Sequence, residues 1–321
     1  MNIKSVVVHE IKKAEKATGA EIILTDKALD HTDAKIIDIV TKLDESFGKK
    51  TLKRAKFNDD GFKKTIPDFS AINLLKKSKE LTTNLKANIQ NIPAAKGGYL
   101  LFCEYESTKK FLAVYLIRDT KSPLFKLKED NSWDVIDSHH LEIEHFAMGA
   151  KINLDILNSK SDDRYIALIK GNTDVSGYFE NWIGIDDTKQ ETKDADALYE
   201  ISNQIDLPNG LSRDEFKKSI YDFANSQTSK VINLRALSKH LYDNEDTITK
   251  YCEEKSIDID GEFKLTRSQL SKFIKIVIKV GEIELRAPRG SFKPNGIEVN
   301  GESVVIHNKE FAIALIQKLK D

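Results

Sequence analysis

Two apolar runs, residues 99–103 and 111–117, constrain the fold of this chain more than any other stretch. A polar patch between them, residues 106–110, can supply the turn of a β-hairpin over residues 97–119. Neither run alternates apolar with polar side chains, which is typical of strands covered on both faces. The sequence therefore predicts a central hairpin in an antiparallel sheet that helices cover.

Helical periodicity predicts helices over residues 32–48 and 68–89, and both are expected to cover one face of that sheet. The basic residues 49–56 are interpreted as the exit of the first helix. Further strands are expected in "IKSVVVHEIKK", "AEIILTDKALD", "WDVIDSHHLEIEHF", "AKINLDIL" and "RYIALIKG", followed by a helix in "VSGYFENWIGI". Residues 1–185 are thus predicted to form an α+β domain, an N-terminal antiparallel sheet covered by helices.

The remaining residues, 186–321, are predicted to form a second domain. A chain of 321 residues exceeds the usual size of one hydrophobic core, and the polar, acidic stretch "DDTKQETKDAD" marks the boundary. Helices are expected over residues 195–205 and 212–228, then in "NLRALSKHL" and "NEDTITKYCEEK". The pattern then changes to strand period and finishes with a helix over residues 309–319. The prediction is a helical C-terminal domain ending in a small β-sheet and a helix, and the overall class is α+β.

Charge is unevenly distributed along the chain, although the net charge is only −1. Residues 42–88 carry twelve Lys/Arg and six Asp/Glu, whereas residues 131–207 carry six Lys/Arg and sixteen Asp/Glu. Residues 264–294 are basic again, with eight Lys/Arg and two Glu. Two basic faces on an acidic body could dock a polyanion. Ordinary solvated surface is the alternative.

Cations beside aromatic residues in these stretches are the candidate phosphate contacts, since such contacts are independent of base sequence. In the first stretch the candidates are Lys49, Lys50, Lys53, Arg54, Lys56, Lys63 and Lys64. In the second they are Arg286, Arg289 and Lys293. This pattern favours non-specific binding of duplex DNA. A helix-turn-helix with a β wing, in which Arg235 and Lys239 would face nucleic acid, is a second possibility.

Catalytic chemistry has little support in the sequence. No phosphate-cradling glycine motif is present. The stretch "DSHHLEIEH" resembles a metal cluster, but strand alternation would place only His140 on the face of Glu142 and Glu144. A nuclease using this region is kept as the least favoured alternative. The sequence therefore predicts no enzyme, no metal site and no cofactor.

The expected cellular location follows from the absence of a membrane-spanning stretch and of a disulfide framework in the sequence. The chain contains no apolar stretch of about 18 residues, the length that a membrane-spanning helix needs. Its two cysteines, Cys103 and Cys252, are far apart and form no persuasive disulfide framework. A cytoplasmic protein with no membrane partner is expected.

Several segments, in order, resemble the bacterial nucleoid-associated protein family NdpA, also called YejK-like. They are "GGYLLFCEY", "HHLEIEHFAMGAKINLDIL", "RYIALIKG" with "GYFENWIG", and "INLRALSKHL". The resemblance implies a non-catalytic protein of the cytoplasm and nucleoid that binds DNA, and it adds Lys170 as a phosphate contact. A protein-interaction module acting on a DNA-processing enzyme, or in anti-phage defence, is the alternative. A homodimer is left open.

Overall fold

Two compact units make up the chain in this computed structural model, and each is described by itself. The first comprises residues 1–190 with residues 258–262, and the second comprises residues 191–257 with residues 263–321. Part of the stretch expected to link two domains, residues 187–190, lies outside the described residues. The structure describes residues 1–159, 161–170, 173–186, 191–208 and 210–320.

An antiparallel sheet forms the centre of the first unit. Its strand order is β10-β3-β9-β8-β5-β4-β1-β2. The predicted hairpin is confirmed as β4 and β5, which pair from Tyr99 opposite Ile117 to Glu106 opposite Lys110. The strands are β1 (Asn2–Lys12), β2 (Glu21–Ile23), β3 (Leu52–Phe57), β4 (Gly98–Glu106), β5 (Lys110–Ile117), β8 (Met148–Asn153), β9 (Ile166–Ile169) and β10 (Ile185–Asp186).

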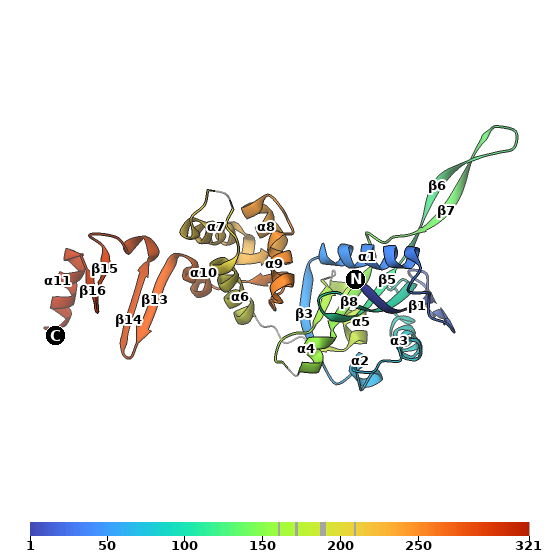
Figure 1. Cartoon of the computed structure of the whole chain (residues 1–321), viewed down its shortest axis with the longest axis horizontal. Helices are drawn as coiled ribbons and strands as arrows, with labels where there is room; N and C mark the ends of the chain where they lie inside the picture. Colours follow the sequence, from blue (N-terminus) through green and yellow to red (C-terminus); the bar gives the residue numbers. More distant parts are fainter. Residues whose placement is uncertain (160, 171–172, 187–190, 209, 321) are drawn as a thin grey trace. The chain divides into compact units, whose positions relative to one another are not determined.

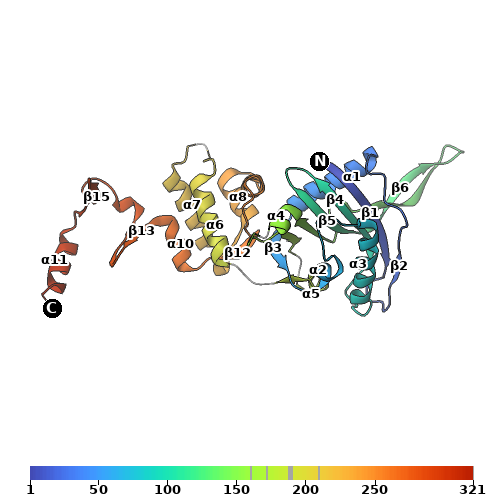
Figure 2. The same ribbon diagram turned by 60° about the horizontal axis from the view of Figure 1, so that its bottom comes forward.

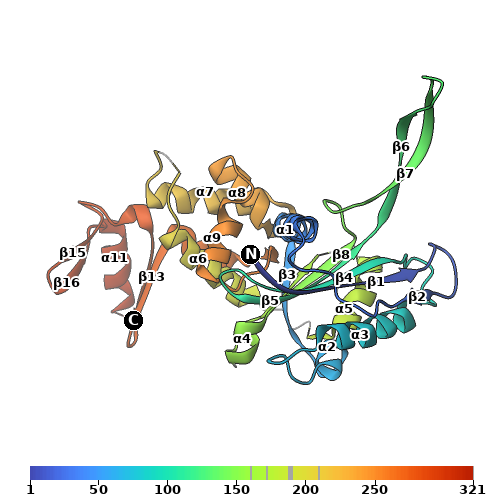
Figure 3. The ribbon, with the colours of Figure 1, turned by 45° about the vertical axis from the view of Figure 1, so that its right-hand side comes forward.

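Each face of the hairpin is buried against different helices. Leu101 and Cys103 pack in one apolar cluster with Phe47 of α1 (Ala34–Gly48). Phe102 packs in the other with Trp182. The helices of this second face are α2 (Gly61–Thr65), α3 (Leu74–Ile89) and α5 (Thr173–Ile183). Figure 3 shows α1 on one side of the sheet and α2 and α3 on the other. The expectation that both early helices cover one face is wrong, because strands that are apolar on both faces need cover on both.

The interpretation of the basic stretch after α1 is also wrong. This stretch is the strand β3, not a helix exit, because α1 ends at Gly48 and residues 52–57 pair with β9 and β10. Within β3, Ala55 and Phe57 alternate into the core while their neighbours stay half-buried. The helix predicted over residues 68–89 is α3, which begins at Leu74, since the Asn73 side chain accepts a hydrogen bond from the Lys76 amide as its N-cap.

A two-stranded arm projects from the first unit between β5 and β8 (Figures 1 and 2). It consists of β6 (Asp119–Leu127) and β7 (Trp133–Leu141), paired from Asp119 opposite Leu141 to Leu127 opposite Trp133. Only β7 was expected as a strand. The expected strand "AKINLDIL" is a strand only to Asn153, after which the chain turns into α4 (Leu154–Ser159).

Helices dominate the first half of the second unit, as predicted. Residues such as Leu198, Phe216, Leu237 and Phe273 form its buried interior. The elements are α6 (Glu191–Gln204), α7 (Arg213–Ser226), β11 (Val231–Asn233), α8 (Leu234–Tyr242), α9 (Thr247–Lys255), β12 (Glu262–Lys264) and α10 (Arg267–Ile274). Two hairpins and a helix follow: β13 (Lys275–Val280), β14 (Ile283–Pro288), β15 (Ile297–Asn300), β16 (Ser303–Ile306) and α11 (Lys309–Lys318). The predicted α+β class is confirmed.

Candidate nucleic-acid interface

The cations of β3 point at carboxylates. Lys53 Nζ lies 3.0 Å from Glu180 Oε2, and the two side chains are only 22% and 24% exposed. Lys56 Nζ lies 2.6 Å from Asp162 Oδ1. A phosphate that binds here has to displace a carboxylate that already compensates each charge.

An acidic segment, residues 258–262, covers the neighbouring cations. The Arg54 amide donates to Asp260 Oδ1 at 2.6 Å, and Lys170 pairs with Glu262. Arg164, which is 3% exposed, lies between Asp258 at 2.8 Å and Asp260 at 3.2 Å. These pairs hold the segment on the sheet, so the predicted contacts Arg54 and Lys170 lie beside structural carboxylates.

The end of α1 is different. Lys49 is exposed, and Lys50 Nζ donates to the Glu144 carbonyl oxygen at 3.1 Å. A carbonyl accepts a hydrogen bond without cancelling the charge. Both cations therefore keep their charge for an anionic ligand.

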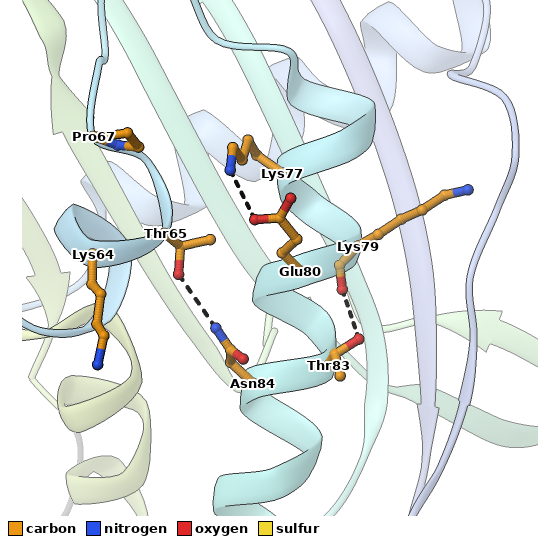
Figure 4. Close-up of a pocket in the computed structure, with 8 residues that line it drawn as sticks. All are labelled: Lys64, Thr65, Pro67, Lys77, Lys79, Glu80, Thr83 and Asn84. Carbon is orange, nitrogen blue, oxygen red and sulfur yellow. Dashed lines mark hydrogen bonds and ion pairs between the residues drawn. The ribbon is translucent and has the colours of Figure 1, made fainter.

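A shallow groove of about 620 Å³ lies between α2 and α3 (Figure 4). Asn84 Nδ2 donates to Thr65 Oγ1 at 3.3 Å and ties the two helices together. The groove combines cationic, hydroxyl and amide groups, all of which can contact a phosphate. Its lining residues are Lys64, Thr65, Pro67, Lys77, Lys79, Glu80, Thr83 and Asn84.

The groove belongs to a wider basic surface on the solvent side of α2 and α3, which we name the α3 lysine face. It arises because α3 packs its apolar residues, among them Leu81 and Leu85, on the sheet and leaves the lysines outside. Figure 4 shows Lys77 beside Glu80, while Lys79 extends away from α2. The members of the face are Lys63, Lys64, Lys76, Lys77, Lys79 and Lys86.

Two of its ion pairs have carboxylates that are almost fully exposed. Lys79 Nζ lies 2.6 Å from Asp26, which is 92% exposed, and Lys63 lies 2.7 Å from Asp59, which is 96% exposed. Each lysine lowers the pKa of its partner carboxyl through a hydrogen bond and its charge. Exposed pairs contribute little and are readily exchanged. Within the described ranges, no carboxylate pairs with Lys64, Lys76 or Lys86.

Sequence reasoning selected only two members of this face, Lys63 and Lys64. It counted the lysines of "LLKKSKEL" in a basic stretch but did not assign them a role. The available signal was that Lys76, Lys77 and Lys79 fall outside the apolar stripe of the helix, so they had to lie outside the core.

In the second unit, the predicted cations are partly engaged. Arg286 lies 2.8 Å from Glu284, and Arg289 Nε lies 3.3 Å from Asp214 Oδ1 without the alignment of a hydrogen bond. Lys293 is exposed.

The contacts of Arg235 and Lys239 give little support to the helix-turn-helix alternative. The Arg235 guanidinium bonds to Glu245 at 2.8 Å and also to Asp246, and Lys239 pairs with Asp243 at 2.7 Å. These contacts lie within α8, α9 and the turn between them. Arg235 thus links α8 to the residues that precede α9, whereas Lys239 forms an exposed pair at the end of α8, and both cations already have a carboxylate partner.

The histidine-rich stretch lies on the arm and beyond it. His139 Nδ1 lies 2.8 Å from Asp119, His140 Nδ1 lies 3.2 Å from Ser122 Oγ, and Glu142 accepts a hydrogen bond from Thr120. The residues that the structure describes contain no group of three His, Cys, Asp or Glu side chains placed to hold a metal ion. Cys103 is fully buried, and burial raises the pKa of its thiol.

An α+β protein with a lysine-rich helical face on one unit and further surface cations on the other has the features of a protein that associates with a polyanion. The family model described as "Nucleoid-associated protein YejK" matches residues 7–312, so the chain belongs to this family of nucleoid-associated proteins. The predicted resemblance is confirmed. The family agrees with the expected location in the bacterial cytoplasm, at the nucleoid.

Individual relatives agree with the family match. The chain is 24% identical to the nucleoid-associated protein YejK of Escherichia coli strain K12, over 86% of this chain and 84% of that protein. The YejK proteins of Shigella boydii serotype 18 and Shigella sonnei are also 24% identical, with the same coverage. In the described residues, no helix has the length and apolar character to cross a membrane.

Proposed function

We propose that this nucleoid-associated protein is non-catalytic and binds duplex DNA without base specificity, with the α3 lysine face as its main contact. The observation that carries the proposal is the set of exposed and partly exposed lysines on the solvent side of α2 and α3, with weak or no carboxylate partners. Lysine is a mobile point charge, suited to phosphates rather than to reading base edges.

The remaining predicted cations take secondary roles in this proposal. Lys49, Lys50 and Lys293 keep charge for a phosphate, and Arg286 exchanges one exposed carboxylate for it. Lys53 has a half-buried partner, Glu180, whereas the partner of Lys56, Asp162, is 88% exposed and can be exchanged for a phosphate as Asp26 can. The contribution of Lys53 to DNA binding is therefore smaller, and the same holds for Lys170 and Arg289, which pair with Glu262 and Asp214. Arg54 lies beside Asp260, which accepts a hydrogen bond from its backbone amide, and it also takes a secondary role.

Fluorescence anisotropy with a 20-bp duplex over a salt series tests the proposal. The variant Lys64→Gln/Lys76→Gln/Lys79→Gln removes three charges from the face. Because each lost phosphate contact reduces the slope of log K against log salt by about 0.9, the slope should fall by up to about 2.7. Binding should weaken equally for unrelated duplex sequences.

A matched variant controls for net charge. Lys27→Gln/Lys35→Gln/Lys110→Gln removes three exposed lysines that lie outside the face and have no carboxylate pair in the described part of the chain. It should bind nearly as the natural protein does. Equal losses in both triple variants, or no binding by the natural protein at low salt, would exclude the α3 lysine face as the DNA site.

A second candidate function, docking of another protein such as a DNA-processing enzyme, is favoured by the arm. Phe125 lies opposite Val135, and Leu127 lies opposite Trp133, so these four side chains share one face of the ribbon. All four are exposed. Contiguous exposed apolar surface marks interaction sites. The variant Phe125→Ser/Trp133→Ser should no longer bind a purified partner protein but should still bind DNA. This result would separate the docking role from the DNA-binding role.

A homodimer completes the proposal. Two copies held together would present two α3 lysine faces to one duplex and raise the apparent affinity without any new contact to DNA.

A further inference from the structure

The last 47 residues of the chain carry an unusual amount of uncovered apolar surface. In the hairpin β13–β14, Ile276 lies opposite Ala287, Ile278 opposite Leu285, and Val280 opposite Ile283. Paired residues point to the same face of a two-stranded sheet, and so do residues two apart. One face of this hairpin is therefore entirely apolar, and its outer end is exposed at Ile278, Val280 and Ile283.

The next hairpin repeats the arrangement. In β15–β16, Ile297 lies opposite Ile306, and Val299 lies opposite Val304. Three of these four side chains are exposed, while Ile297 is buried. The second hairpin thus has an apolar face as well, and each of the two hairpins is a separate two-stranded sheet.

The closing helix α11 is exposed along its whole length. Phe311, Leu315 and Leu319 recur at helical spacing, and Ile316 lies beside them, which gives the helix an apolar stripe. A helix of this length is marginal in water unless such a stripe packs on something. Two-stranded hairpins are equally marginal alone.

Eleven large apolar side chains in these three elements are 37–77% exposed. Together they amount to on the order of 1,000 Å² of surface, against the roughly 800 Å² that each partner buries in a standard stable interface. A surface of this size, spread over every element of a segment, resembles a hydrophobic core cut in half. Interfaces of that kind are typical of obligate assemblies.

We infer that residues 275–319 form a homodimer interface, in which the apolar faces of β13–β14, β15–β16 and α11 pack against the same segment of a second copy of the chain. The inference deepens the proposed function, since it rests on the homodimer assumed there and names its surface. A segment that needs its partner in order to fold requires that partner in equal amount at all times, and only another copy of the chain guarantees this. Closed two-fold pairing of one surface with itself is the commonest arrangement of soluble oligomers.

The charges fit this arrangement. Lys275, Lys279 and Arg286 alternate onto the other face of β13–β14, away from its apolar residues. Pairing through the apolar face therefore leaves these cations in solvent. A polyanion such as DNA is a poor occupant of the apolar faces themselves, because phosphates would lose hydration there without gaining charge contacts.

The inference is tested by light scattering of the full chain after size exclusion at 300 mM salt without DNA. The natural protein should have twice the 36.4 kDa mass of one chain at micromolar concentration. Ile283→Lys/Leu315→Lys should give single chains. Phe125→Lys/Trp133→Lys, which places the same two charges on the apolar face of the arm, should stay dimeric.

Hydrogen exchange of the natural protein provides a measurement that does not depend on a variant folding. On raising the concentration, amides of residues 275–319 should become protected, and those of the arm should not. A natural protein that stays a single chain up to 100 µM, or a dimer that forms without new protection in this segment, would overturn the inference. So would dissociation by the arm variant alone.

Failure of this inference and failure of DNA binding are distinguishable. At 300 mM salt without DNA, the mass does not depend on phosphate contacts. A single-chain variant should still bind a short duplex through the α3 lysine face, but with lower affinity for long DNA than the dimer.

Discussion

Lys79 Nζ lies 2.6 Å from Asp26 Oδ1, across from α3 to the loop after β2, and Asp26 is 92% exposed. This pair is the clearest case of a lysine on the proposed DNA surface held by a carboxylate that solvent can release. The carboxylate therefore competes with phosphate for Lys79.

Removing the competitor should strengthen DNA binding. We expect Asp26→Asn to tighten duplex binding by about two- to fivefold at low salt, with the gain disappearing at high salt. Asp30→Asn is the control, since Asp30 is also exposed but accepts its hydrogen bonds from Thr32 rather than from a lysine. Anisotropy measures both, and equal gains in the two variants would mean that net charge alone is responsible.

Lys53 should contribute more to the stability of the first unit than to its affinity for DNA. Replacing it by Met leaves Glu180 half-buried beside an apolar side chain, which should cost about 1–2 kcal/mol, between the values for exposed and buried pairs. Lys53→Met/Glu180→Gln should recover part of this loss. Urea unfolding measures the change. An unaltered midpoint together with a large loss of DNA affinity would show that Lys53 is a phosphate contact instead.

His9 makes the first unit sensitive to acid. The Thr25 amide donates to its Nδ1 at 3.1 Å, and its Nε2 lies 2.9 Å from Ser78 Oγ. Burial, with a smaller effect from the charge of Lys79, lowers the pKa of His9 from 6.5 to about 4. The unfolded chain therefore takes up a proton first, and stability present above pH 6.5 is lost as the pH falls towards 4.

The loss attributable to His9 should be about 2 kcal/mol between pH 7 and pH 5. Unfolding of the first unit can be followed by the fluorescence of buried Trp182 in a Trp133→Phe background. His9→Gln should flatten the dependence on pH in this window while lowering stability at pH 7. If the free energy of unfolding depends on pH equally with and without His9, His9 is not the group responsible for the acid sensitivity.

Gly97 should tolerate no side chain. A Cβ at this position would lie 2.0 Å from the Ile11 carbonyl oxygen, where β1 and the start of β4 come together. Gly97→Ala should destabilise the first unit by at least about 2 kcal/mol. Gly177→Ala in α5 is the control, because nothing lies within 4 Å of its new methyl group, and alanine favours helix by up to about 1 kcal/mol. Thermal unfolding compares the two.

The sequence predicted the central hairpin, the α+β fold class and most helices. These features depend on local periodicity and on continuous apolar runs, which are not found in strands with a solvent-exposed face. The sequence did not predict that β3 is a strand. Residues 52–57 consist largely of lysines and arginine, and only Ala55 and Phe57 among them are buried, so the strand alternation is short and weak. The burial of these two residues depends on pairing with β9 and β10, which lie far along the chain.

The candidate site was harder to predict for a similar reason. Composition located the basic stretches but could not tell which cations meet carboxylates, because those partners come from distant residues. Glu180 faces Lys53, and Asp260 accepts from the Arg54 amide, from 127 and 206 residues away. By contrast, the position of Lys76 and Lys79 outside the core follows from helix periodicity alone.

Chemical labelling of lysines by an acetylating reagent, read out by mass spectrometry with and without duplex DNA, tests the central claim most directly. Lys64, Lys76, Lys79 and Lys86 should be protected by DNA, and Lys27 and Lys35 should be labelled equally in both samples. Protection confined to lysines outside α2 and α3, or none at a DNA concentration that saturates binding, would contradict the claim that the α3 lysine face contacts DNA.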